Sequence, residues 1–424
     1  MAKDVAPTGR LSRWRIAAVD SDRVGPGAGD TPGPIVQRIR DQAAVGSPDF
    51  KRIMLMLVGV LAVSQIAVVL LKNTSKSTRS VVSGPLSLAA GIASVGIALL
   101  FLGRYVRIVP HRYRMIASVS AVLLGFIMLT GSAVRLTGSG LGCPDWPTCK
   151  QGKVVPASGT HAQIEFGNRI VTGLCVSAAA IGVLTALVRV PYRRDLVRLG
   201  LLTSFLIFAN AILGGLTVIY GLKPQFVMSH FLLAIGTLAS GVLVFHRAGE
   251  PGGSRDLWGR DRVAAVDPLS ARLVQALTAA WLTVMLLGTI TTGSGPHGGD
   301  PEVDRFSYSM RDIVRIHSGA VWVMLALTVV LAVRAARTPG HAASEVRRRV
   351  SALLAVSLLQ GAVGYIQYFN RFPAGLVQAH VLGAIVGWVS VLWIRAVTWL
   401  PATEPVTAVN LEAARVRGPV SQSG

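Results

Sequence analysis

Residues 130–149 read Thr130-Gly-Ser-Ala-Val-Arg135-Leu-Thr-Gly-Ser-Gly-Leu-Gly-Cys143-Pro-Asp-Trp-Pro-Thr-Cys149. After a short loop the chain continues as Glu165-Phe-Gly-Asn168-Arg169-Ile-Val-Thr-Gly173. The first stretch ends one long apolar segment in a glycine-rich turn and a Cys-x5-Cys loop. The second places a carboxylate and an arginine at the entrance of the next apolar segment. Two apolar segments joined in this way predict a helical hairpin, and the rest of the chain repeats or supports that unit.

The composition is that of a membrane protein. The 424 residues are 51% hydrophobic and 15% charged, and the mean hydropathy is +0.54, which is too apolar for a soluble domain. A bilayer core about 30 Å thick requires roughly 20 apolar residues per helix. Ten runs meet that requirement, at 53–71, 81–103, 115–134, 170–188, 199–222, 224–245, 273–292, 316–333, 350–369 and 374–394.

The net charge of +22 arises from basic residues in many short loops. When alternate loops are assigned to one side of the membrane, 30 of the 42 Lys and Arg fall on the side that holds both termini. This bias follows the positive-inside rule and predicts a multi-pass cell-membrane protein with both termini in the cytoplasm. The basic residues do not form the single patch of a nucleic-acid-binding protein, so no nucleic-acid partner is expected.

Five regions are predicted along the chain. Residues 1–52 form a disordered basic cytoplasmic tail, 53–103 an extra N-terminal transmembrane hairpin, and 399–424 a second cytoplasmic tail. Between them lie two related halves of four helices each, 115–246 and 270–398. The expected fold is therefore an all-α polytopic membrane protein with two pseudo-symmetric four-helix bundles and an added hairpin.

An internal repeat supports the two halves. Thr137-Gly-Ser-Gly140 recurs as Thr292-Gly-Ser-Gly295, and the segment around His230 recurs in outline around His380. Asn168 precedes His230 by 62 residues, and His317 precedes His380 by 63. Both halves begin on the same side of the membrane, so the repeat is parallel, with its axis along the membrane normal.

Three histidines lie inside apolar spans, where a histidine normally has a partner or binds a metal. His230, His317 and His380 all stand in the first turns of a span, near the outer face. His317 and His380 belong to one predicted bundle, so their imidazoles could bind one heme iron from opposite faces. The alternative for each is a histidine hydrogen-bonded into the packing.

Polar residues at the outer ends of the spans suggest further roles. Glu165 could act as an acid or base beside a substrate, or it could cap a helix N-terminus. Four arginines lie on the outer side, where the charge bias predicts few basic residues: Arg135, Arg169, Arg315 and Arg371. They are either partners for heme propionates or solvated residues of the membrane interface.

The cysteines divide into a loop pair and a buried one. Cys143 and Cys149 are close enough to close a small ring in a compartment that permits disulfides, although two free thiols remain the alternative. Cys175 lies within a span and is expected to be a small packing residue. Zinc-protease, phosphate-loop and nucleophile-elbow motifs do not occur in the spans.

These residues together resemble the heme A synthase family, whose members convert heme O to heme A for cytochrome oxidase. The resemblance covers about 115–398 and implies eight helices in two four-helix halves. It implies a heme b cofactor on His317 and His380, with Arg315 and Arg371 nearby. It also implies a heme O substrate near His230, Asn168, Arg169 and Arg135, with oxidation of a heme methyl to a formyl group assisted by Glu165.

The resemblance further implies a redox-active or structural Cys143–Cys149 disulfide and a heme O synthase as a possible partner; it leaves the electron acceptor open. This chain departs from the family at Asn168, where a second axial histidine is often found. The substrate iron would then be bound by His230 alone, or His161 would reach it. The family offers no role for the hairpin 53–103. The main rival function is a quinone-linked electron-transfer cytochrome with two permanent b hemes.

Overall fold

The computed structural model describes residues 108–156, 158–250, 262–300 and 302–401. The predicted tail 1–52, the hairpin 53–103 and residues 402–424 lie outside the described part. Within it, eight helices are long and apolar enough to cross a membrane. The prediction of an all-α, multi-pass membrane protein is thereby confirmed.

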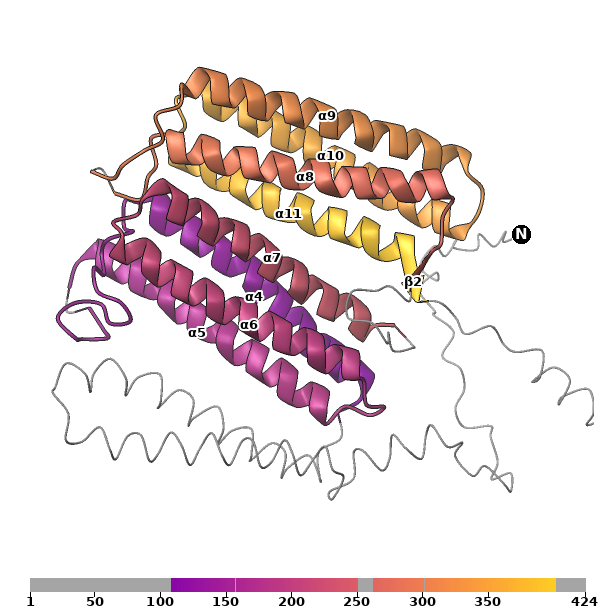
Figure 1. Cartoon of the computed structure of the whole chain (residues 1–424), viewed down its shortest axis with the longest axis horizontal. Coiled ribbons are helices and arrows are strands. Elements are labelled where there is room, and N and C mark those ends of the chain that lie inside the picture. The colour runs from indigo at the N-terminus through magenta and orange to yellow at the C-terminus, as the bar shows by residue number, and fades with distance from the viewer. Residues whose placement is uncertain (1–107, 157, 251–261, 301, 402–424) are drawn as a thin grey trace, which may run out of the picture.

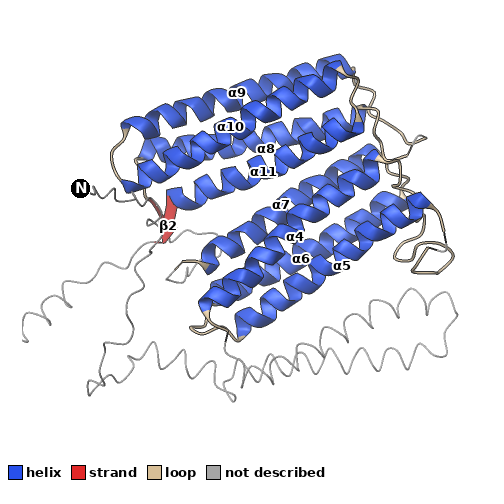
Figure 2. Cartoon of the chain, turned by 180° about the vertical axis from the view of Figure 1, so that it is seen from behind, coloured by secondary structure: helices blue, strands red, loops and turns tan. Residues whose placement is uncertain are grey.

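The eight helices form two groups of four (Figure 1). The first group consists of α4 (Pro110–Leu136), α5 (Thr160–Leu187), α6 (Arg194–Ile219) and α7 (Pro224–Ala248). The second consists of α8 (Pro268–Ser294), α9 (Met310–Arg337), α10 (His341–Phe369) and α11 (Ala374–Thr398). Within each group, every helix packs against its neighbours in sequence, and the first helix also packs against the fourth. The view from behind shows the same two groups side by side (Figure 2).

Most of the helices begin earlier than the apolar runs, because their ends carry polar residues of the membrane interface. The clearest case is α5, which begins at Thr160, ten residues before the run 170–188. Glu165 and Asn168 therefore lie in the second and third turns of a continuous helix. They do not lie at its entrance.

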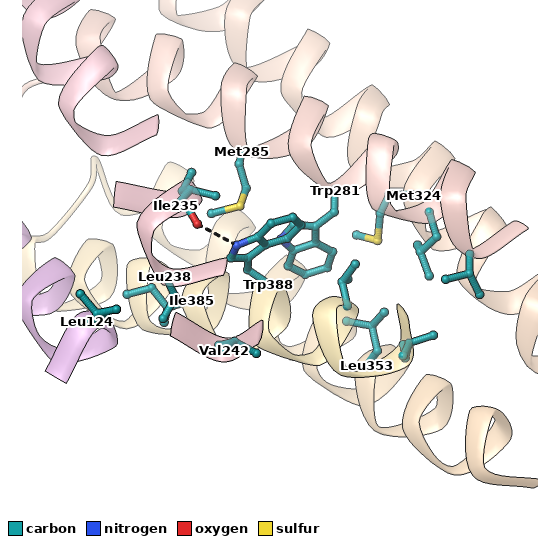
Figure 3. Packing of buried hydrophobic residues seen from close by; sticks show 14 of the residues in the cluster. Leu124, Ile235, Leu238, Val242, Trp281, Met285, Met324, Leu353, Ile385 and Trp388 are labelled. Atoms are coloured by element: carbon teal, nitrogen blue, oxygen red, sulfur yellow. Dashed lines mark hydrogen bonds between the residues drawn. The ribbon is translucent and has the colours of Figure 1, made fainter. Parts of the chain in front are cut away.

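The two groups meet along α4, α7, α8 and α11. Trp388 of α11 donates from its indole nitrogen to the backbone oxygen of Ile235 in α7, at 3.2 Å (Figure 3). Beside it, Gly387 lies so close to the Trp281 ring of α8 that a Cβ would come within 2.2 Å of that ring. In a membrane, helices are held together largely by close packing, since lipid supplies no hydrophobic force between them. Small residues such as Gly387 at a helix contact permit this close approach.

A polar contact also joins the groups. Ser132 of α4 donates from Oγ to Oε1 of Gln378 in α11 at 2.8 Å. The same glutamine donates from Nε2 to the backbone oxygen of Leu129 at 3.0 Å. Side-chain hydrogen bonds between helices are a recognised source of association within membranes, so this pair fixes α4 against α11.

At the opposite end of the bundle from the cysteine loop, two short strands pair antiparallel: β1 (Arg262–Ala264) and β2 (Trp399–Pro401). Arg262 donates to the backbone oxygen of Trp399 and to the carboxylate of Glu250. Burial opposes ionisation of Glu250, but hydrogen bonds from His246 and Arg262 outweigh it and lower the pKa of Glu250 to about 2. This ion-paired cluster links the end of α7 to the strands that flank the second group.

Candidate functional site

Two adjoining cavities lie at the level of the membrane-embedded histidines. One, of about 340 Å³, lies within the second helix group and also meets Arg135 of α4. The other, of about 500 Å³, is lined by all eight helices. Both volumes are in the range of small-molecule sites. His317 and His380 line both cavities, whereas His230 lines only the larger one.

Each of the three histidine rings rests against a glycine of the preceding helix. A Cβ placed on the glycine would lie only 3.0–3.2 Å from the ring carbon Cε1 in all three cases. The pairs are Gly214 with His230, Gly288 with His317, and Gly364 with His380. A glycine is needed at these positions because any side chain would push the ring out of its place.

The rings are oriented by the helix that they rest on. Their Nδ1 atoms are buried and make no well-formed hydrogen bond within the described residues. Each ring interacts instead with a backbone carbonyl one turn before its glycine, at Asn210, Val284 and Gln360. Because Nδ1 is the buried nitrogen in each ring, Nε2 is the nitrogen left for a ligand in the cavity.

The structure brings His317 and His380 to one cavity. They stand on α9 and α11 and line the same 340 Å³ cavity. Within the described ranges there is no group of three or more His, Cys, Asp or Glu that could hold a bare metal ion. A porphyrin supplies four ligands itself and needs only one or two axial residues, so this donor set suits a heme.

The fourth comparable position holds Asn168, which lies beside Gly131. Its Oδ1 accepts a hydrogen bond from Thr130 Oγ1 at 2.7 Å, and the residue lines the larger cavity. His161 does lie on the same helix, but its Nδ1 is hydrogen-bonded with Ser139 Oγ at 2.9 Å, and it lines neither cavity. Within the first group, the described residues therefore place a single imidazole, that of His230, at the larger cavity.

Glu165 is buried, with 5% of its surface exposed, and lines the larger cavity. Its Oε2 accepts from the backbone N–H of Cys143 at 2.6 Å, and its Oε1 accepts from Arg169 Nη2 at 2.7 Å. The interpretation of Glu165 as a helix cap is wrong, because α5 begins five residues earlier and has no acidic residue in its first turn.

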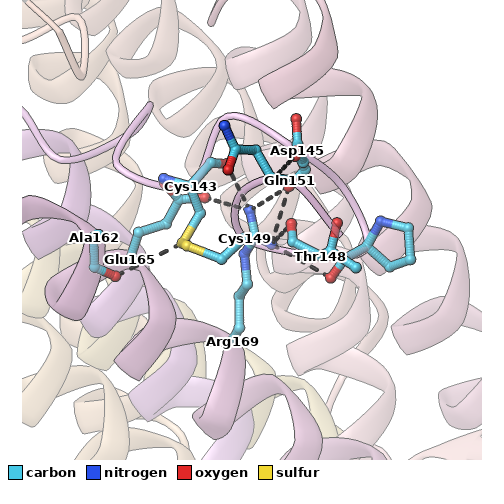
Figure 4. The surroundings of a disulfide bond; sticks show 9 residues. Cys143, Asp145, Thr148, Cys149, Gln151, Ala162, Glu165 and Arg169 are labelled. Carbon is cyan, nitrogen blue, oxygen red and sulfur yellow. Dashed lines mark hydrogen bonds and ion pairs between the residues drawn. A yellow bond between two sulfur atoms is a disulfide. The ribbon is translucent and has the colours of Figure 1, made fainter. Parts of the chain in front are cut away.

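Cys143 and Cys149 form a disulfide, so the alternative of two free thiols is also wrong. Figure 4 shows how Arg169 holds the loop that the disulfide closes. Its guanidinium donates to the backbone oxygens of Cys143, Asp145 and Thr148 at 2.9, 3.2 and 2.7 Å. We predicted Arg169 as a substrate contact. In the structure its guanidinium N–H groups donate to backbone oxygens of this loop, and the residue also borders the larger cavity.

The disulfide loop reaches the cavity through Trp146. Its indole ring lies against Gly215, where a Cβ would meet it at 2.5 Å, and it lines the larger cavity. Gly215 follows Gly214, the glycine under the His230 ring. One glycine pair on α6 thus positions both the loop and the histidine.

The predicted arginines separate into two kinds. Arg135 lines both cavities and donates to the backbone oxygen of His297 at 2.8 Å. Arg315 and Arg371 are exposed and line neither cavity. His297, which we did not predict as a site residue, lines the smaller cavity and bonds through Nε2 with the backbone oxygen of Phe372 at 2.7 Å.

Comparison with known proteins agrees with the geometry. The family COX15-CtaA, described as cytochrome oxidase assembly protein, matches residues 114–392. The heme A synthase of Lysinibacillus sphaericus is 33% identical over 139 residues, covering 32% of this chain and 44% of that protein. The heme A synthase of Alkalihalophilus pseudofirmus is 31% identical over 142 residues, covering 33% of this chain and 46% of that protein.

These matches to single proteins span slightly less than half the length of each relative. The family match is more extensive, since residues 114–392 contain all but the first four residues of α4, all of α5 to α10 and most of α11. This chain belongs to the COX15-CtaA family of cytochrome oxidase assembly proteins.

Proposed function

We propose that this protein is a heme A synthase, which oxidises a methyl group of heme O to the formyl group of heme A. Family membership supports this assignment, and so do the heme A synthases among the similar proteins. The arrangement of the site adds independent support, because two cavities of suitable volume meet half-buried histidines in a membrane bundle.

In this proposal the smaller cavity holds heme b between His317 and His380. Heme b, held by these residues, would supply one-electron redox chemistry for the oxidation. The protein's part is to hold the two imidazoles, each fixed by its glycine, and to keep water from an apolar cavity. Arg135, which borders both cavities, would pair with a propionate.

The observation that carries the proposal is the asymmetry between the two halves. The second half offers two histidines to one iron, which suits a permanent electron-transfer heme. The first half offers His230 together with Asn168, an amide already hydrogen-bonded to Thr130, so a heme bound there would have one histidine as its protein ligand. A cytochrome with two permanent b hemes has no need for such a difference.

Glu165 would serve the reaction as a proton acceptor. With water as the source of the formyl oxygen, converting a methyl to a formyl group releases four protons and four electrons, and the protons must leave a buried site. The Glu165 carboxylate pairs with Arg169, borders the larger cavity and lies near the outer end of α5. It can therefore take a proton on one oxygen while the Cys143 N–H holds the other.

The remaining features of the proposal concern organisation and partners. We propose that the two helix groups are a parallel repeat and that residues 53–103 add a transmembrane hairpin. Both termini would lie in the cytoplasm, in keeping with the loop charges. The substrate would come from a heme O synthase, and the electrons would pass to an acceptor that the sequence does not identify.

Expression together with a heme O synthase, followed by extraction of the hemes, tests the assignment. We expect heme A to accumulate, with heme b bound to the purified protein. If the protein holds two b hemes and the cells make no heme A, the quinone-linked cytochrome is the correct assignment. Chromatography and mass spectrometry of the extracted hemes distinguish the two results.

A substitution at Asn168 tests the asymmetry. The variant Asn168→His places an imidazole beside Gly131 and opposite His230, and we expect the heme of the first half to become six-coordinate and low-spin. Electron paramagnetic resonance of the oxidised protein should then show a second low-spin signal beside that of heme b. A spectrum identical to that of the wild type would contradict the assigned position of Asn168.

A further inference from the structure

Asn210 is a polar residue of the larger cavity that the proposed mechanism does not use. It stands on α6, one turn before Gly214, and lines the cavity. Its Oδ1 atom is buried and has no hydrogen-bond partner within the described part of the chain. A buried carbonyl oxygen without a donor is unfavourable, so its presence in an apolar cavity wall calls for a donor on the ligand.

The second half shows what happens when the corresponding amide has a protein partner. Gln360 precedes Gly364 by one turn, as Asn210 precedes Gly214. Its Nε2 donates to the backbone oxygen of His380 at 2.6 Å. Both amides line the larger cavity, but the Gln360 side chain is held by a bond within the protein, whereas Asn210 Oδ1 has no donor among the described residues. The difference falls in the half assigned to the substrate, where a specific ligand contact is useful.

The depth of Asn210 selects one edge of the ligand. At the helical rise, the nine residues to the outer end of α6 at Ile219 place Asn210 about 14 Å from that end. Arg135 lies in the last turn of α4, at the outer end of the bundle. A heme whose propionates face Arg135 has its opposite edge toward Asn210. In heme O that edge carries the farnesyl arm, whose first carbon bears the only alcohol of the molecule.

We propose that Asn210 is a specificity-determining residue that accepts a hydrogen bond from the alcohol of the hydroxyethylfarnesyl arm of heme O. The inference rests on the proposed function, since it assumes heme O in the larger cavity. The alcohol can donate to the Asn210 oxygen, which satisfies the unpaired atom. Heme b lacks this alcohol and would leave the oxygen unpaired, and a site built to bind a hydroxyl rejects ligands without it.

Binding measurements with two ligands isolate this contact. Purified protein that retains heme b is titrated with heme O and with heme O whose alcohol has been removed by dehydration. We expect the wild type to bind heme O about tenfold or more tightly than the dehydrated form. The variant Asn210→Leu should bind both forms equally, because it removes the acceptor for the alcohol. The substitution should therefore weaken the binding of heme O and leave that of the dehydrated form unchanged.

Two further variants complete the experiment. Asn370→Leu makes the same chemical change at an exposed amide directly after α10 and should keep the wild-type preference. Asn210→Ala repeats the test without adding volume, and the heme b absorbance shows that each variant is folded. If Asn210→Leu and Asn210→Ala keep the wild-type preference, or if the wild type shows none, the inference is overturned.

Turnover in the same preparation separates this inference from the proposed function. If the wild type converts heme O to heme A but the preference does not depend on Asn210, only the role of Asn210 fails. If the wild type neither binds heme O nor forms heme A, the proposed function fails with it.

Discussion

Replacing His380 by alanine is expected to abolish the low-spin heme b of the purified protein. His380 and His317 are the only histidines that line the 340 Å³ cavity from within helices, and each is held by a glycine of the neighbouring helix. Removing one imidazole leaves the iron with a single protein ligand, so both the low-spin spectrum and heme retention should be lost. His317→Ala should have the same effect. Reduced-minus-oxidised absorbance and heme quantification measure the result.

His161→Ala is the matched control for this experiment. His161 is exposed, bonds with Ser139 and lines neither cavity, so its removal should leave the heme b spectrum unchanged. Retention of one low-spin heme b per chain in both His317→Ala and His380→Ala would contradict the assignment of this cavity.

Replacing Glu165 by glutamine is expected to reduce heme A formation by about 10²- to 10⁴-fold, the usual contribution of general acid–base catalysis. Glutamine keeps the size of the side chain and can still accept one of the two hydrogen bonds, but it cannot accept a proton. Heme b should remain bound, since Glu165 does not line its cavity. Extraction of hemes from cells that supply heme O measures the loss.

A second variant separates the chemical role of Glu165 from its contact with the disulfide loop. Glu165→Asp keeps a carboxylate and should restore part of the activity, whereas a purely structural role would make it no better than glutamine. Mass spectrometry after alkylation shows whether the Cys143–Cys149 bond persists in each variant. Wild-type rates of heme A formation in Glu165→Gln would contradict the proton-acceptor role.

Much of the fold could be predicted from the sequence because bilayer thickness dictates the length of apolar runs. All eight runs within the described part correspond to helices. The predicted ends of the helices were less accurate, since polar residues such as Thr160 and His161 extend a helix beyond its apolar part. This error produced the interpretation of Glu165 as a cap. The disulfide alternative was also left open, because sequence spacing does not show which thiols are bonded.

The histidines were identifiable because an imidazole is rare within an apolar span, but the groups that position them were not. Gly288 and Gly364 look like ordinary glycines of membrane helices, and only the fold shows that each faces a ring. Asn210 was overlooked because a lone amide has no spacing pattern. Charge alone could not distinguish Arg135, which reaches the cavities, from Arg315, which does not.

The hydrogen bonds between Ser132 and Gln378 have a consequence for electron transfer. Ser132 follows Gly131, which lies beside Asn168, and Gln378 stands two residues before His380. These hydrogen bonds therefore connect the two proposed heme sites at the level of their ligands. Alternating-access rocking, as in transporters with repeated halves, would break it. Tunnelling rates fall steeply with donor–acceptor separation, and a bundle locked in this way would hold that gap constant throughout the catalytic cycle.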